Sequence, residues 1–250
     1  MNNLEKKERI EIDFWKESKT ENPGEFTIEN LVNKVGDAEV FLSLLEKYNT
    51  HFLNANKILE LGGGQGWASC IIKKKFNKYT ILSDISPFAV ESVKYWEDIY
   101  KVKIDASFAC KSYQIPLADK SVDLIFCYAA AHHFVEHEKT LVEIERVLAI
   151  GGKCLYMYEP SCKPYLYKLA KKRVNKNRPE VPEDLLIVAN MIDIATKHGL
   201  KITVEYFPSI LKRRLFATIY YSFLTKFLFL NKILPSTVNL IFEKNNNGGN

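Results

Sequence analysis

From Lys57 onward, short apolar runs alternate with amphipathic stretches. The runs are rich in aliphatic and aromatic residues and are bounded by Gly, Pro, Asp or Ser, which predicts strands. We expect strands at residues 57–61, 79–84, 104–109, 122–128, 153–159, 200–207 and 237–242, and helices at 67–76, 87–100, 136–148 and 182–198. Such alternation is typical of a parallel sheet with helices on both faces, which binds ligands beyond the carboxyl ends of its strands.

The alternating unit defines the expected domain organisation. Residues 1–56 are expected to form a helical unit, in which Thr27 can cap a helix that runs through Leu31 and Leu45. Residues 57–244 form the α/β domain, and residues 208–235 within it form an aromatic helical insertion before the last strand. Residues 245–250 have the composition of a disordered tail.

The composition is that of an ordinary globular chain. Of its 250 residues, 47% are hydrophobic and 26% are charged, and the net charge of +5 is too modest to indicate a nucleic-acid binder. The five cysteines are scattered and form no C-x-x-C pair, and the N-terminus lacks an apolar signal region. We therefore expect reduced cysteines and a cytoplasmic protein.

The most specific local signal is a strand that runs into a glycine-rich turn and then a helix. Gly62, Gly64 and Gly66 allow the backbone to turn tightly and to approach a ligand closely. The N-terminus of the following helix offers unpaired N–H groups and partial positive charge to a carboxylate. Asp84 ends the next expected strand, where a carboxylate can accept hydrogen bonds from both hydroxyls of a ribose.

A nicotinamide-dependent enzyme would use the spacing G-x-G-x-x-G or G-x-G-x-x-A at this turn. Trp67 stands at the last place of the frame that starts at Gly62, and Ser69 stands at the last place of the frame that starts at Gly64. The spacing therefore favours G-x-G-x-G preceded by the acidic Glu60.

Four motifs in order resemble the class I S-adenosylmethionine-dependent methyltransferase family, especially its ubiquinone/menaquinone-biosynthesis and small-molecule branch. They are ILELGGGQG, LSDIS, IPLADKSVDLIFCYAAAHHF and EIERVLAIGGKCLYMYE, and the resemblance covers Lys57 to Glu159. It implies a Rossmann-like, doubly wound α/β sheet of seven strands, mostly parallel with an antiparallel last strand. It also implies S-adenosyl-L-methionine as the cofactor, and an N-terminal helical lid that carries Phe14 and Trp15.

The resemblance also implies roles for individual residues. The methionine part of the cofactor would lie on the glycine turn with Glu60 beneath its amino group, the ribose on Asp84, the adenine on Ile85, and the methyl group beside Tyr128 and Ala129. The turn comprises Gly62, Gly63, Gly64 and Gly66.

The adenine position departs from the family pattern. The usual Gly-Asp pair aligns with Cys110 and Lys111, and a lysine cannot accept the hydrogen bond of the adenine amino group. We expect the backbone at Ser112 and Tyr113 to recognise adenine instead.

An oxygen or nitrogen acceptor must lose a proton during methylation. His132 and His133 follow the fourth expected strand, and His133 matches a histidine often found in this branch, so His133 is the candidate base and His132 and Tyr128 are further catalytic candidates. The alternative for His133 is a passive place in the pocket wall or at a helix cap. No metal site is expected, because adjacent histidines should point apart and no carboxylate pair completes a ligand set.

Two segments carry further expectations about partners. Seven basic and no acidic residues fall between residues 163 and 178, as expected for a solvated loop or for contact with an anionic substrate or membrane surface. Apolar residues recur at helical spacing in the insertion, behind Lys212, Arg213 and Arg214, but Lys226 interrupts them too early for a bilayer span. The insertion could cap the pocket, form a homodimer face, or lie peripherally on a membrane through residues 212–234.

These features predict methyl transfer to a small-molecule, sugar or lipid-linked acceptor. A methyltransferase-like binding protein without catalysis is the alternative that Lys111 supports, and a nicotinamide-dependent oxidoreductase is a weaker one. Nucleic acid is not expected as a substrate, because Tyr128 is followed by three alanines rather than by the Pro-Pro-Tyr element that would hold a flipped base.

Overall fold

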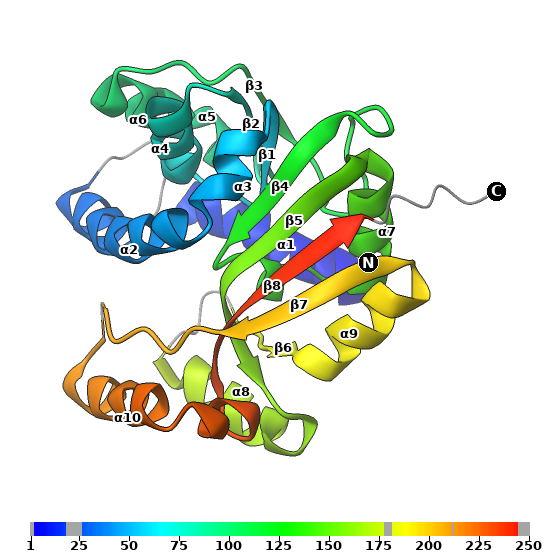
Figure 1. Ribbon diagram of the computed structural model, residues 1–250. Helices are drawn as coiled ribbons and strands as arrows, with labels where there is room; N and C mark the ends of the chain where they lie inside the picture. The colour runs from blue at the N-terminus through cyan, green and yellow to red at the C-terminus, as the bar shows by residue number, and fades with distance from the viewer. Residues whose placement is uncertain (1–2, 19–26, 178–181, 212, 245–250) are drawn as a thin grey trace.

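The computed structural model describes residues 3–18, 27–177, 182–211 and 213–244. A mixed sheet forms the centre of this part of the chain, with strands in the order β3-β2-β1-β4-β5-β8-β7 and a short β6 paired with β5 (Figure 1). Strand β8 is antiparallel to both β5 and β7, and the remaining pairs are parallel. The strands are β1 (Lys57–Leu61), β2 (Tyr79–Asp84), β3 (Ala106–Ala109), β4 (Val122–Tyr128), β5 (Leu148–Cys162), β6 (Leu186–Ile187), β7 (Leu200–Tyr206) and β8 (Ser236–Lys244). The predicted Rossmann-like fold with its antiparallel last strand is confirmed.

Helices cover both faces of the sheet (Figure 1). They are α1 (Asn3–Glu17), α2 (Ile28–Lys47), α3 (Asn49–Asn54), α4 (Trp67–Phe76), α5 (Pro87–Glu91), α6 (Val93–Tyr100), α7 (His137–Val147), α8 (Tyr167–Val174), α9 (Val188–Lys197) and α10 (Leu215–Lys226). Neighbouring strand residues belong to opposite cores: Ile58 packs with α2, α3, α4 and α6, whereas Leu59 packs with α7 and α9. Burial on both faces explains why the central strands are nearly continuous apolar runs.

The described part of residues 1–56 forms three helices, α1, α2 and α3, of which only α2 was predicted from its cap. The Oγ1 atom of Thr27 accepts a hydrogen bond of 3.1 Å from the backbone N–H of Asn30, as the sequence predicted. The buried face of α2 carries Phe41, Leu44 and Leu45. The expected disordered tail at 245–250 lies outside the described residues.

Two helix predictions were wrong in their bounds. The helix expected over 87–100 breaks at Ser92, whose hydroxyl donates to the backbone oxygen of Ala89 and so competes with helical hydrogen bonding. The helix expected over 182–198 begins only at Val188, because Leu186 pairs with Ser161 of β5 and forms the short strand β6.

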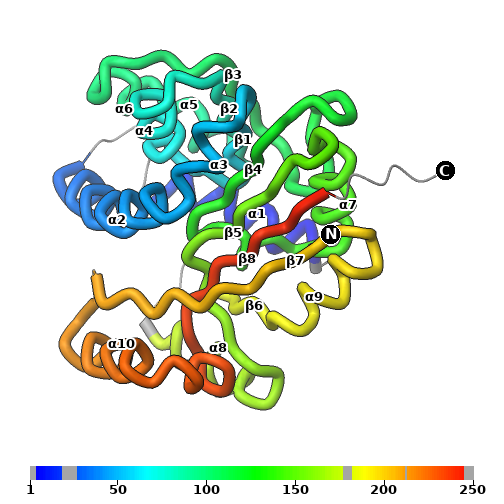
Figure 2. Tube along the Cα trace, in the orientation of Figure 1, coloured from blue at the N-terminus to red at the C-terminus, as the bar shows by residue number. Residues whose placement is uncertain are grey.

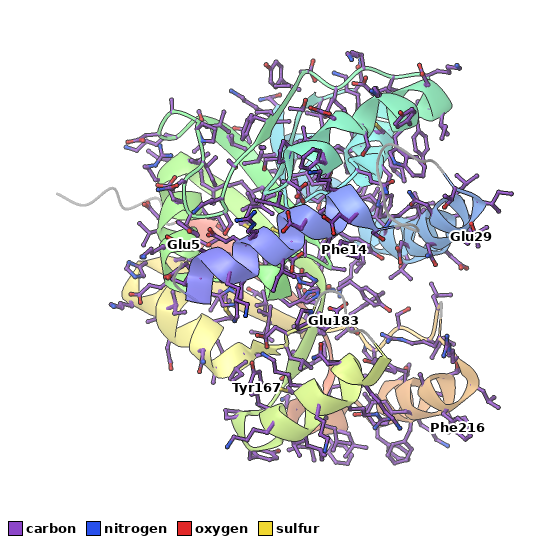
Figure 3. All side chains as sticks on the ribbon, turned by 180° about the vertical axis from the view of Figure 1, so that it is seen from behind. Glu5, Phe14, Glu29, Tyr167, Glu183 and Phe216 are labelled. Carbon is purple, nitrogen blue, oxygen red and sulfur yellow. The ribbon has the colours of Figure 1, made fainter. Side chains whose placement is uncertain are left out.

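Three helices gather around the ends of the strands. Helix α1 crosses the far side of the molecule, with Phe14 towards one end of it and Glu183 below it (Figure 3). Helices α8 and α10 lie together at the end of the sheet where β5 turns away (Figures 1 and 2). No helix within the described ranges combines the length and apolar character that crossing a bilayer requires.

Candidate active site

The carboxyl ends of β2, β1 and β4 lie side by side, because β1 pairs in parallel with both other strands. Gly62 follows β1, Asp84 ends β2, and Ala129 follows β4. The backbone N–H groups of Gly62 and Gly63 both donate to the backbone oxygen of Ser83, at 2.9 Å each. The residues predicted around the cofactor therefore meet at one edge of the sheet.

The glycine turn needs glycine for two separate reasons. Gly64 and Gly66 have positive φ angles of +53° and +80°, which residues with a side chain rarely adopt. A Cβ atom on Gly66 would lie 2.6 Å from Leu82, and one on Gly64 would lie 2.8 Å from the ring of Trp15 in α1. The turn thus holds its shape while the N-terminal helix packs directly against it.

Asp84 is a buried carboxylate at the end of β2. Its oxygens accept hydrogen bonds from the backbone N–H of Gly64 at 2.8 Å and of Ser86 at 2.9 Å. Burial raises the pKa of Asp84 to about 6, although both hydrogen bonds act in the opposite direction. The carboxyl therefore reaches its ionisation midpoint below neutral pH and is mostly ionised at pH 7.

Glu60 lies beneath the turn and is fully enclosed. Its carboxylate accepts from the backbone N–H of Ser69 at 2.9 Å and from the hydroxyl of the same residue. Burial raises the pKa of Glu60 to about 8. Glu60 thus braces the start of α4 from below.

One large cavity of about 1540 Å³ opens at this edge of the sheet. Of the predicted cofactor residues, Gly62, Asp84, Ile85, Ser112, Tyr113 and Ala129 line it. Glu60, Gly63, Gly64, Gly66 and Tyr128 lie behind that wall rather than on it. Helix α1 supplies part of the opposite wall, including Phe14 and Trp15.

Lys111 and Tyr113, in the segment that departs from the family pattern at the expected adenine position, both contact α1. The ammonium of Lys111 lies 2.7 Å from a carboxylate oxygen of Glu8, and the hydroxyl of Tyr113 donates to the other oxygen of Glu8. The hydroxyl of Ser112 lies 2.8 Å from that of Thr140 in α7. Lysine at position 111 therefore has a partner in α1.

Tyr128, a predicted catalytic residue, is directed into the protein. Its hydroxyl donates to the backbone oxygen of Asp37 in α2 at 3.0 Å, and its ring packs against Phe41 and Trp67. Burial raises the pKa of Tyr128 far above its ordinary value. It follows that Tyr128 supports the cavity wall from behind. The next residue, Ala129, has a positive φ of +48°, a strained conformation of the kind that occurs at functional sites.

The two histidines adopt an arrangement that the sequence reasoning did not anticipate. His132 and His133 belong to a single turn of 3₁₀ helix, η1 (Ala131–His133), and their ring centroids are only 4.1 Å apart. The expectation that adjacent side chains point apart was wrong, because the 3₁₀ turn and the surrounding carboxylates draw both rings to the same cavity wall. Both rings contact Glu183, from the segment before β6.

Carboxylates hold both rings in place. His132 contacts Glu159 through Nδ1 at 2.7 Å, and His133 contacts Glu11 of α1 through Nδ1 at 2.9 Å. Burial acts to raise the pKa of Glu159, but hydrogen bonds from His132 and from the backbone of Ala131 outweigh it and lower that pKa. Glu159 is therefore an ionised anchor for the turn that carries the histidines.

The far end of the cavity is basic and aromatic. Arg173 of α8 and Arg213 and Arg214 before α10 line it, together with Tyr220 and Tyr221. The guanidinium carbon of Arg213 lies 3.7 Å from the ring centroid of Tyr221, and its Nη2 donates to the hydroxyl of Tyr158 at 2.8 Å. The basic segment and the insertion therefore meet on one cavity wall.

Solved structures share this architecture, including two of proteins described as methyltransferases. The YcgJ protein of Bacillus subtilis is 18% identical with a TM-score of 0.60, covering 82% of this chain and 99% of that one. Geranyl diphosphate C-methyltransferase of Streptomyces coelicolor A3(2), solved with Mg²⁺, geranyl diphosphate and S-adenosyl-L-homocysteine, is 10% identical with a TM-score of 0.66, covering 83% and 80%. A protein of Galdieria sulphuraria provisionally assigned as a sarcosine dimethylglycine methyltransferase is 16% identical with a TM-score of 0.62, covering 96% and 99%. Among curated protein sequences, none matches this chain significantly.

A family model described as a methyltransferase domain matches residues 59–156. The match runs from β1 into β5, so it includes the glycine turn, Asp84 and the histidine pair. Residues 59–156 therefore match a methyltransferase domain, and the fold around them is the one seen in solved methyltransferases. The match favours S-adenosylmethionine over a nicotinamide cofactor at the glycine turn.

Three glutamates at the candidate site were missed from the sequence. Glu8 and Glu11 are three residues apart on α1, so both side chains lie on the same side of this helix. That spacing was a usable signal, because Phe14 continues the same face. Glu183 gave no local signal, since its partners His132 and His133 are about fifty residues away in the chain.

Proposed function

We propose that this protein is an S-adenosylmethionine-dependent methyltransferase whose acceptor is a small molecule that combines an apolar body with an anionic group. The observation that carries the proposal is the shape and lining of the cavity, which runs from Asp84 at the end of β2 to Arg213 before α10. Its volume of about 1540 Å³ exceeds the 300–1,000 Å³ of ordinary ligand pockets. Such a volume accommodates the donor and an acceptor of similar size together.

The donor would occupy the end of the cavity nearest the glycine turn. The carboxylate of its methionine part would approach the N-terminus of α4, because the partial positive charge of a helix N-terminus attracts anions. Asp84 would accept the ribose hydroxyls, Ile85 would pack on the adenine, and the backbone at Ser112 and Tyr113 would meet the adenine edge. Glu60 would act indirectly, because it braces Ser69 and lies behind the cavity wall.

The acceptor would occupy the end of the cavity nearest α8 and α10. Leu166, Leu169, Ala217 and Leu234 provide apolar wall there, and three arginines provide positive charge. Guanidinium groups suit carboxylate and phosphate oxygens, because they can donate two parallel hydrogen bonds. An acceptor with both an apolar and an anionic part would therefore match this lining.

His133 would promote loss of the acceptor proton. It lines the cavity just beyond β4, and Glu11 fixes its ring through Nδ1. A neutral imidazole in that orientation presents Nε2 as the nitrogen that can take a proton. His132 is almost fully buried between two carboxylates and would position its neighbour rather than react.

The outer face of α10 is separate from the cavity. Leu215, Phe216 and Ile219 are all more than half exposed there, whereas Ala217, Tyr220 and Tyr221 line the cavity. This lining supports the interpretation that one face of the helix caps the pocket. A homodimer contact or a peripheral membrane contact through its other face stays a prediction.

The proposal is tested by finding the acceptor without choosing it beforehand. Purified protein is incubated with methyl-labelled S-adenosylmethionine and with cell extract separated into anionic amphiphilic, neutral lipid and neutral polar fractions. We expect label to enter the anionic amphiphilic fraction, and to be lost with the variant Asp84→Asn. Label transfer only to neutral polar compounds would contradict the proposed acceptor class while leaving the methyltransferase assignment intact.

A further inference from the structure

Two imidazole nitrogens and a carboxylate converge at one point of the cavity wall. An oxygen of Glu183 lies 2.9 Å from Nε2 of His132 and 3.5 Å from Nε2 of His133. One ligand atom from each of the three residues can be chosen so that all lie within 4.8 Å of one another. Their side chains are largely shielded, with exposed fractions of 5%, 26% and 16% for His132, His133 and Glu183.

Both histidines are oriented in the same way by a second carboxylate. Nδ1 of His132 contacts Glu159 at 2.7 Å, and Nδ1 of His133 contacts Glu11 at 2.9 Å. In metal sites, a histidine ligand commonly donates its other ring N–H to a carboxylate, which fixes the tautomer and turns the free lone pair towards the ion. The carboxylate–histidine arrangement thus occurs twice, and both free nitrogens face Glu183.

The polarity of these contacts calls for a cation between them. A neutral imidazole has a single N–H, so when Nδ1 donates to a carboxylate, Nε2 presents a lone pair. Nε2 of His132 then faces the lone pairs of Glu183 at 2.9 Å, which is unfavourable unless a proton or a metal ion lies between the two atoms. Because His133 presents a second nitrogen to the same oxygen, an ion satisfies all three groups at once.

We propose that His132, His133 and Glu183 bind a divalent transition-metal ion, with Glu159 and Glu11 orienting the two imidazoles. Two imidazoles and one carboxylate suit Zn²⁺ and related ions rather than Mg²⁺ or Ca²⁺, which prefer sites made of oxygen ligands. Three protein ligands are typical of sites that keep a position open for water or a substrate. All three ligands line the cavity, so that position is available to a small molecule.

The metal ion would take part directly in the reaction. This role rests on the proposed function, whereas the metal site itself does not. An acceptor hydroxyl that binds the ion would release its proton to solvent water more readily, because the ion stabilises the resulting alkoxide. In the metal-bound protein His133 would therefore promote proton loss as a ligand of the ion.

The test is metal binding to the full chain purified without a histidine tag. The protein is stripped with a chelator, dialysed and titrated with Zn²⁺ by calorimetry, and bound metal is measured by elemental mass spectrometry. The variants are His132→Ala and Glu183→Gln, the second of which keeps the shape of the side chain. His198→Ala is the matched control, since His198 also contacts a carboxylate, that of Glu138 at 3.0 Å, but does not line the cavity.

We expect one Zn²⁺ per chain in the wild type and in His198→Ala, and an affinity lower by about tenfold or more in both cluster variants. Thermal unfolding of each variant checks that the fold is retained. The proposal is overturned if the stripped wild type binds no Zn²⁺ at about millimolar concentration, or if Glu183→Gln and His198→Ala bind Zn²⁺ equally well. The same samples are also titrated with S-adenosyl-L-homocysteine. Loss of binding of this compound would contradict the proposed function alone and would leave the metal site unaffected.

Discussion

The backbone N–H of Gly64 donates a hydrogen bond of 2.8 Å to Oδ2 of Asp84. This bond joins the glycine turn after β1 to the carboxylate at the end of β2, so the two proposed donor-binding elements form one unit. Trp15 of α1 packs on the same glycine, which adds the N-terminal helix to that unit. Changes at any of these residues should therefore affect donor binding.

Donor binding should depend on pH through Asp84. Burial raises the pKa of this carboxyl to about 6, so it is mostly ionised at pH 7 and mostly protonated at pH 5. Only the ionised form accepts hydrogen bonds from both ribose hydroxyls without donating one. We expect the affinity for S-adenosyl-L-homocysteine to fall as the pH is lowered from 7 to 5, measured by calorimetry. Asp84→Asn should bind more weakly, by about tenfold or more, and without this pH dependence.

The glycine turn can be tested with two matched alanine variants. Gly64→Ala and Gly199→Ala both place a side chain at positive φ, +53° and +70°, and each should lose about 1–2 kcal/mol in free energy of unfolding. Only Gly64→Ala also brings a Cβ atom to 2.8 Å from Trp15, whereas Gly199 has open space around it. Gly64→Ala alone should weaken binding of S-adenosyl-L-homocysteine. Equal affinities in the two variants would argue against a donor site at this turn.

Removing His133 should separate chemistry from donor binding. The variant His133→Ala loses the side chain proposed to promote proton loss, and general acid–base groups contribute about 10²–10⁴-fold to rate. We expect turnover to fall by roughly 10²-fold or more, with the affinity for S-adenosyl-L-homocysteine nearly unchanged. His198→Ala should leave both quantities unaltered. Unimpaired turnover in His133→Ala would remove His133 from the mechanism.

The arginine-lined end of the cavity should determine acceptor affinity. Arg173 and its neighbour Lys172 are both exposed on α8, but only Arg173 lines the cavity. Arg173→Gln should raise KM for an anionic acceptor by about tenfold or more, because a charged hydrogen bond contributes roughly 1.5–3 kcal/mol. Lys172→Gln should leave KM unchanged. If the two variants behave alike, the anionic part of the acceptor binds elsewhere.

Local sequence patterns were sufficient to predict which residues gather at the proposed donor end of the cavity. Gly62, Asp84 and Ala129 were placed correctly at strand ends, because each follows an apolar run whose bounds are marked by Gly, Asp or Tyr. Alternation and turn residues report on burial and backbone direction within about ten residues, and the glycine turn and strand ends need no more than that.

The residues around the histidine pair are brought together by contacts between distant positions in the sequence, which no local pattern predicts. Glu11 meets His133 across 122 positions in sequence, and Glu183 meets His132 across 51. Glu183 also falls in a segment whose apolar spacing predicted helix, and which the structure shows as extended because Leu186 pairs with β5. Local patterns could therefore mark one face of α1, but they could not assign Glu11 or Glu183 as partners of the two imidazoles.

The donor site itself is tested most directly by calorimetric titration of the purified chain with S-adenosyl-L-methionine and with S-adenosyl-L-homocysteine. We predict one equivalent of each bound per chain by the wild type, and binding weakened by about tenfold or more in Asp84→Asn. If the wild type binds neither compound at about millimolar concentration, a donor pocket between Gly62 and Asp84 is contradicted.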